Sequence, residues 1–89
     1  MTENELRNFV KINLTNTGTA YDAEIDAWIA AAEADITNST GKEFDIADPI
    51  QCAMVVLYVR AFFGDGDTTA SERYVRMLKK LGIQSEAAE

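Results

Sequence analysis

The chain has 89 residues, enough for one domain with a single core. Its 15 Asp and Glu against 8 Lys and Arg give a net charge of −7, which argues against a free-standing nucleic-acid binder because such proteins attract phosphate with a basic surface. One cysteine cannot form an internal disulfide, and the absence of histidine excludes the usual Cys and His zinc sites. The first residues, MTENELRNF, have neither a basic start nor an apolar run, so we expect no signal peptide and a cytoplasmic protein.

The first predicted helix begins with a capping box, because Thr2 and Glu5 have the Thr-x-x-Glu spacing. The helix extends to about Lys11 or Ile12, and a polar loop follows it. Leu6 and Phe9 belong to its inner stripe, so we expect both side chains in the core.

The second predicted helix starts at Asp22 as N-cap and ends near Thr37. Its core face contains apolar residues at intervals of three and four, namely Ile25, Trp28, Ile29, Ala32 and Ile36. The opposite side is mostly alanine with acidic borders, and consists of Ala27, Ala30, Ala31, Ala34, Asp26, Glu33 and Asp35. Two interpretations of this side stay open, because alanine favours the helix by propensity and also lets a second helix approach closely.

The third predicted helix, residues 49–63, is hydrophobic all round. Asp48 as N-cap and Pro49 at the first helical position start it, and Gly64 ends it. Twelve of its fifteen residues are apolar or aromatic. At about 1.5 Å per residue it reaches roughly 22 Å, too short for a hydrocarbon core of about 30 Å, so we expect it to be buried in protein. One side packs into the bundle, and the other meets the remaining helices or a neighbouring subunit.

The fourth predicted helix begins with a second capping box at Thr69 and Glu72. Its inner stripe contains Tyr74, Val75, Leu78 and Leu81, and Gly82 ends it in a Schellman motif. The fold class is therefore all-α, a small bundle of about four helices around the hydrophobic helix at 49–63. We expect one domain over residues 1–83, a disordered tail over 84–89, and projecting loops over 41–47 and 64–71.

Charge is unevenly distributed along the chain. The segment from Asp22 to Asp48 has eight acidic residues and one basic residue, Lys42. The fourth helix carries half of the positive charge within about 120° of its circumference, at Arg73, Arg76, Lys79 and Lys80. These acidic and basic faces are either ordinary solvated helix surfaces or contact surfaces, and the sequence leaves both interpretations open.

Residues suited to catalysis are scarce. No histidine is present for general-base work, and Cys52 lies inside the apolar helix, where a thiol is normally inert. The Asp65-Gly66-Asp67-Thr68 turn lacks the further ligands of a calcium loop. We therefore expect no enzyme, no cofactor and no metal.

Two binding functions are alternatives. A DNA-mimic inhibitor would display the acids of residues 22–48 as a phosphate-like row to a DNA-binding enzyme. A helix-turn-helix DNA binder, which ranks below it, would use the fourth helix for recognition, but the basic face of that helix has no Asn, Gln or Ser for base contacts.

Two stretches, YDAEIDAWIAAAEADITNSTG and DPIQCAMVVLYVRAFFGDG, resemble the small head-tail connector family of tailed bacteriophages and prophages. The resemblance covers about residues 21–66. It implies a small helical bundle that forms a ring, twelve-fold, beneath the portal and continues the DNA channel. It also implies the portal protein and a downstream stopper or tail protein as partners, DNA that passes without sequence-specific binding, and no membrane. Such a protein would assemble in the bacterial cytoplasm and end at the head-tail interface of the virion.

A ring requires head-to-tail contacts, for which faces of opposite charge are suited. The expected subunit interface contains Arg73, Arg76, Lys79, Lys80, Asp26, Glu33, Asp35, Val59 and Phe63. The expected core contains Leu6, Phe9, Ile25, Trp28, Ile29, Ile36, Ile50, Met54, Leu57, Tyr74 and Leu78.

Overall fold

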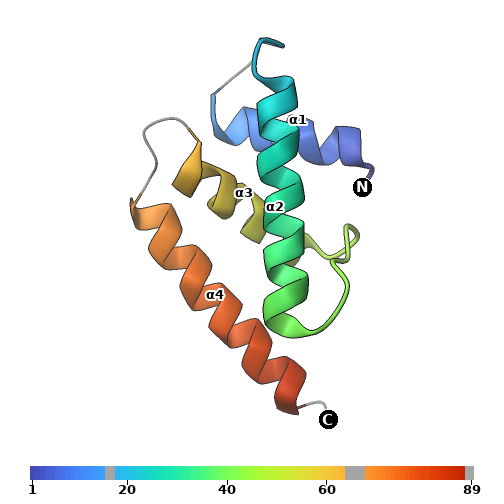
Figure 1. Cartoon of the computed structure of the whole chain (residues 1–89), viewed down its shortest axis with the longest axis vertical. Coiled ribbons are helices and arrows are strands. Elements are labelled where there is room, and N and C mark those ends of the chain that lie inside the picture. The colour runs from blue at the N-terminus through green and yellow to red at the C-terminus, as the bar shows by residue number, and fades with distance from the viewer. Residues whose placement is uncertain (16–17, 64–67, 88–89) are drawn as a thin grey trace.

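The computed structural model describes residues 1–15, 18–63 and 68–87, with side chains described as far as Lys80. These residues form four helices, and no strand occurs among them. The helices are α1 (Glu3–Asn13), α2 (Asp22–Thr40), α3 (Pro49–Phe62) and α4 (Thr68–Ala87) (Figure 1). The expectation of a small all-α bundle is confirmed.

The predicted starts of α1 and α3 are correct. The Thr2 hydroxyl accepts a hydrogen bond from the Glu5 amide at 3.1 Å, and the Glu5 carboxylate accepts one from the Thr2 amide at the same distance. This capping box lowers the pKa of Glu5, chiefly through the bond from the Thr2 amide. The Asp48 carboxylate accepts from the Ile50 amide at 2.9 Å, directly before Pro49 at the first helical position.

Both predicted ends of α2 differ from the structure. Tyr21, which provides no side-chain hydrogen bond, precedes the helix, whereas Asp22 is already helical and its carboxylate pairs with Lys11. The helix continues past Thr37 to Thr40. Its C-cap is Gly41, whose φ of 74° is the left-handed conformation that glycine adopts without steric cost.

The fourth helix is longer than predicted at both ends. It begins at Thr68, so residues 68–71 are helical and do not form a projecting loop. It also passes through Gly82 to Ala87, so the predicted Schellman ending is wrong and residues 84–87 are helical. One glycine in a helix costs about 1 kcal/mol relative to alanine, which the neighbouring helix-forming residues can offset. Gly64, the rest of the predicted loop and residues 88–89 lie outside the described residues.

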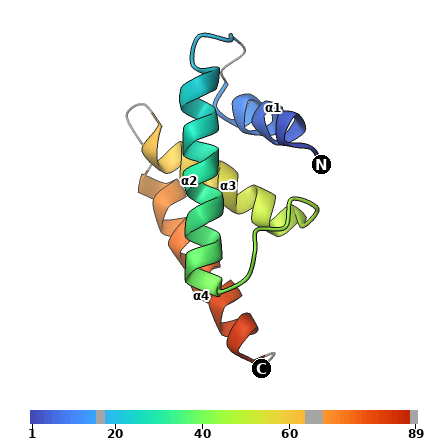
Figure 2. The same cartoon turned by 45° about the vertical axis from the view of Figure 1, so that its right-hand side comes forward.

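The third helix is the centre of the bundle. It packs against α1, α2 and α4, whereas the described parts of α1 and α4 make no contact with one another. Figures 1 and 2 show α1 and α4 on different sides of α3, with α2 crossing in front of it. This arrangement explains the apolar circumference of α3, because three helices approach it from different directions.

The core consists of side chains from all four helices. Its buried members are Leu6, Val10, Ile25, Ile29, Ala32, Ile36, Cys52, Met54, Val55, Val56, Val59 and Tyr74. Trp28, Leu57 and Leu78 are partly buried and pack against this core. None of the helices, over the described residues, is both long enough and apolar enough to cross a membrane.

Three apolar side chains expected in the interior are exposed. Phe9 is 37% exposed because α4 does not reach α1 and leaves this side of α1 open. Ile50 is 56% exposed because it lies in the first turn of α3, where no helix covers it, whereas Met54 one turn later is fully buried. Val75 is 46% exposed because α4 turns Tyr74 and Leu78, rather than Val75, toward the core.

Candidate functional site

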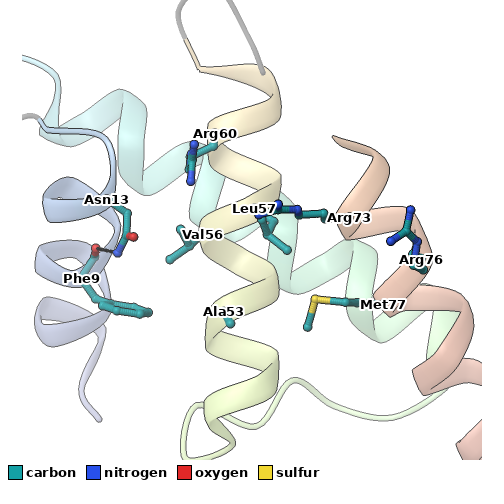
Figure 3. Close-up of a pocket in the computed structure, with 9 residues that line it drawn as sticks. All are labelled: Phe9, Asn13, Ala53, Val56, Leu57, Arg60, Arg73, Arg76 and Met77. Carbon is teal, nitrogen blue, oxygen red and sulfur yellow. Dashed lines mark hydrogen bonds between the residues drawn. The ribbon is translucent and has the colours of Figure 1, made fainter. Parts of the chain in front are cut away.

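An open groove of about 480 Å³ lies between α1 and α4, with α3 as its floor. Figure 3 shows the lining side chains, with α1 on one side, α3 in the middle and α4 on the other. The groove exists because α1 and α4 both pack on α3 but do not touch each other within the described residues. Its lining consists of Phe9, Asn13, Ala53, Val56, Leu57, Arg60, Arg73, Arg76 and Met77.

The groove combines an apolar floor with guanidinium groups. Leu57 from the floor and Met77 from α4 are partly exposed, and Phe9 forms part of the opposite wall (Figure 3). Arg73 and Arg76 are exposed, and neither forms an ion pair with another described residue. The groove therefore presents apolar surface bordered by positive charge in a protein whose net charge is −7.

The basic face extends beyond the groove along α4. Lys79 and Lys80 are exposed and line a second hollow together with Arg76 and Met77. All four basic residues expected at a subunit interface are thus on the surface, and two of them, Arg73 and Arg76, border the groove. Arg60 of α3 was not included in that expectation, although its position in an otherwise apolar helix is a signal that could have indicated it.

Two of the acidic residues expected at the interface are bonded within the chain. Asp26 accepts hydrogen bonds from Arg7 Nε at 2.7 Å and Arg7 Nη2 at 2.6 Å. This bidentate pair lowers the pKa of Asp26 and raises that of Arg7. Asp35 accepts a hydrogen bond from the Tyr74 hydroxyl at 2.5 Å, which joins α2 to α4. Burial, followed by this bond, raises the pKa of Tyr74.

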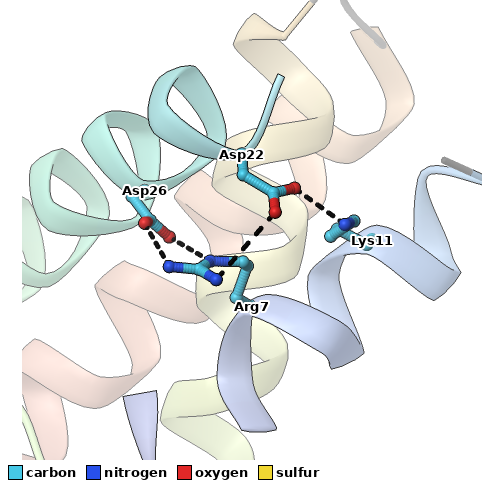
Figure 4. A network of polar contacts seen from close by, with 4 residues as sticks. All are labelled: Arg7, Lys11, Asp22 and Asp26. Atoms are coloured by element: carbon cyan, nitrogen blue, oxygen red, sulfur yellow. Dashed lines mark hydrogen bonds and ion pairs between the residues drawn. The ribbon is translucent and has the colours of Figure 1, made fainter. Parts of the chain in front are cut away.

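A network of ion pairs joins α1 to α2 (Figure 4). It was not predicted from the sequence. Lys11 Nζ lies 2.7 Å from an Asp22 carboxylate oxygen, and Arg7 lies 4.0 Å from the other. Arg7 and Lys11 are four residues apart on α1, as are Asp22 and Asp26 on α2. Two basic residues on one helix and two acidic residues on the next, each four residues apart, are the sequence signal that could have predicted this network.

Glu33 occupies a different environment from the other acids of α2. It lines a hollow between α1 and α2 together with Glu3, Arg7 and Asp26. Burial, followed by the nearby Glu3 carboxylate, raises the pKa of Glu33 to about 7. Glu33 is therefore only partly ionised at neutral pH, unlike an ordinary surface glutamate.

Val59 and Phe63, both expected at an interface, are covered by their own chain to different extents. Val59 is fully buried among the four helices, so its assignment to a subunit contact is wrong. Phe63 is partly buried against the core, and its ring forms an edge-to-face contact with the ring of Tyr21 at a centroid distance of 5.9 Å. Val59 lies on a side of α3 that faces the other helices, whereas Phe63 is the C-cap just beyond α3 and is covered in part by the core and by Tyr21.

The single thiol has the environment of a packing residue. Cys52 is buried, and its Sγ donates to the Ile46 carbonyl at 3.2 Å. Burial raises its pKa, which disfavours the nucleophilic thiolate. Over the ranges that the structure describes, no group of three or more Cys, Asp or Glu residues is placed to hold a metal ion. The expectation that the protein is no enzyme stays a prediction.

The fold and the groove together define a small all-α bundle with an arginine-lined apolar groove on one side. No family model, no curated protein and no solved structure matches this chain.

Proposed function

We propose that this chain is a non-enzymatic structural protein of a tailed-phage virion, which forms a ring beneath the portal, joins head to tail and continues the DNA channel. The resemblance in residues 21–66 suggests this role. The main support for this proposal is the separation of acidic and basic groups onto opposite sides of the subunit, because a ring needs two different surfaces that complement one another.

The two charged sides are separated by the central helix. The groove with Arg73 and Arg76 lies on one side of α3, and in Figure 3 α2 passes behind α3 on the other side. Of the five acidic residues of α2, Asp22, Asp26 and Asp35 are bonded within the chain, so Glu24 is the exposed acid that this side offers to a neighbour. A neighbour that approaches with its acidic side therefore meets the basic side of the next subunit, which is the head-to-tail arrangement that a ring requires.

The remaining elements of the proposal follow from the resemblance and the net charge. A twelve-fold ring requires a rotation of about 30° between successive subunits. Its partners are the portal protein above and a stopper or tail protein below. The acidic composition suits the wall of a channel through which DNA passes without adhering, because like charges repel. The subunit would be made in the bacterial cytoplasm and remain at the head-tail interface.

Several of the carboxylates that a DNA mimic would display are bonded to other residues of the same chain. Asp22 and Asp26 pair with Lys11 and Arg7, and Asp35 accepts from Tyr74, so these carboxylates are engaged within the chain. Nothing in the geometry favours the DNA mimic or the helix-turn-helix alternative over a structural role.

The test is the molar mass of the purified protein by light scattering on a sizing column, from micromolar to millimolar concentration and at low and moderate salt. The expected result is a discrete species whose mass is a fixed multiple of the subunit and which is annular in negative-stain images. A protein that stays monomeric throughout this range would contradict the proposal.

A further inference from the structure

We propose that the groove between α1 and α4 receives the outer face of α2 from a second copy of this chain. Here the outer face of α2 means Ala23, Glu24, Ala27, Ala30 and Ala34, all of which are exposed. This inference rests on the proposed function, because it names the two surfaces through which neighbouring subunits of the ring meet.

The composition of the groove restricts what can fill it. Leu57, Met77 and Phe9 supply apolar surface, so an occupant must bring apolar atoms to the middle of the contact. Arg73 and Arg76 border that surface, so the occupant must also carry acidic groups at its edge. A surface that is apolar along its middle and acidic at its border satisfies both requirements.

The outer face of α2 has this composition. Its alanines recur at intervals of three and four residues and therefore follow one line along the helix, opposite the buried Ile25 and Ile29. Methyl side chains let a helix approach an apolar floor closely. Glu24 on one border is exposed, whereas Glu33 on the other border is partly buried in the hollow beside α1. Glu24 thus gives this face a charge opposite to that of the groove.

The positions of the two surfaces favour contact of the groove with the outer face of α2 over contact between two grooves or between two α2 faces. They lie on opposite sides of α3, because in Figure 3 the residues that line the groove lie in front of or beside α3 and α2 passes behind it. One subunit can therefore use both surfaces at once, each with a different neighbour. Two grooves placed face to face would instead bring their arginines together, and two α2 faces would bring their acids together, both of which are unfavourable.

Two variants, each damaging one surface, test the pairing. Arg73→Glu reverses a charge at the border of the groove, and the double substitution Ala27→Arg with Ala30→Arg adds bulk and positive charge to the outer face of α2. All three positions are exposed, so helicity by circular dichroism should be unchanged. Lys42→Glu is the matched control, because Lys42 is exposed outside both surfaces and its reversal changes the net charge as Arg73→Glu does.

Each variant alone is expected to lose assembly, with the concentration needed for association raised at least about tenfold, whereas Lys42→Glu assembles like wild type. The mixture of the two variants is expected to give a one-to-one heterodimer. In it, the intact groove of the Ala27→Arg, Ala30→Arg variant accepts the intact α2 face of the Arg73→Glu variant. This pair is expected not to grow, because the bulk of the two introduced arginines keeps the remaining α2 face off the floor of the remaining groove, although the reversed charge of that groove attracts them. Native mass spectrometry measures the heterodimer directly.

The other outcomes separate the two proposals. If wild type forms a ring and both variants do so equally well, this contact is refuted while the ring stands. If each variant is monomeric but their mixture gives no heterodimer, the pairing of these two surfaces is likewise refuted. If wild type never associates, the ring and this contact fail together.

Discussion

Tyr74→Phe tests the link between α4 and α2 with the smallest change that the chain allows. The substitution removes only the hydroxyl, which donates to Asp35 at 2.5 Å, and keeps the ring, which is 5% exposed. The edge-to-face contact of this ring with Tyr58, at a centroid distance of 5.1 Å, should persist. Any loss of stability is therefore assigned to the hydrogen bond.

The expected magnitude follows from the environment of the bond. Hydrogen bonds to charged acceptors contribute about 1.5–3 kcal/mol. Asp35 is only half-buried, so water can replace part of the lost bond, and we expect a loss of about 1–2 kcal/mol in the free energy of unfolding. Because about 1 kcal/mol shifts the melting temperature of a domain of this size by about 4–8 °C, the melting temperature should fall by about 4–16 °C.

The assay is urea unfolding at dilute concentration, followed by circular dichroism and by the fluorescence of Trp28. Tyr58→Phe is the matched control, because Tyr58 is a partly buried tyrosine whose hydroxyl makes no hydrogen bond with another described residue. We expect its loss to stay below about 0.5 kcal/mol. Equal losses for the two variants would refute the role given to the Tyr74 hydroxyl.

Three further predictions concern α1, α2 and α3. The pKa of Glu33 is raised to about 7, so its contribution to stability is full below its ordinary pKa and is lost as pH rises through 7. In urea titrations, Glu33→Gln should therefore have a free energy of unfolding about 1 kcal/mol above that of wild type at pH 8 and nearly equal to it at pH 4.5. No difference between the two pH values would contradict the raised pKa. Val59→Ala removes buried methyl groups and should lower the free energy of unfolding of the monomer by about 2–3 kcal/mol. Ile50→Ser, at an exposed position, should lower it far less. Similar losses for the two variants would place Val59 outside the core. Arg7→Gln should raise the pKa of Asp26 toward its ordinary value, which NMR titration of the carboxylate measures, and an unchanged pKa would exclude the ion pair in solution.

The elements that could be predicted from the sequence depend on local interactions. The capping box at Thr2 and the Asp48-Pro49 start of α3 involve neighbouring residues only, and both are present in the structure. The buried face of α2 followed from the spacing of Ile25, Ile29 and Ile36, because one side of this helix meets the bundle along its length.

What could not be predicted depends on how far one helix reaches along another. The periodicity placed Phe9 and Ile50 toward the core, but periodicity does not reveal that α4 leaves α1 uncovered or that the first turn of α3 is open. The groove is a product of the same arrangement, so its basic residues on α4 were predicted while its apolar floor was not. Val59 was misplaced because an all-round apolar helix gives no indication of which side has intramolecular partners.

The attachment of α1 has a consequence for hydrogen exchange. This helix is held by two fully buried apolar side chains, Leu6 and Val10, and by the ion pairs of Arg7 and Lys11, and it lacks any contact with the described part of α4. Its amide protons should therefore exchange through an opening that leaves the other three helices folded. Because the same helix forms one wall of the groove, a subunit seated there would oppose that opening, and the slowing of exchange in α1 would report occupancy of the groove residue by residue.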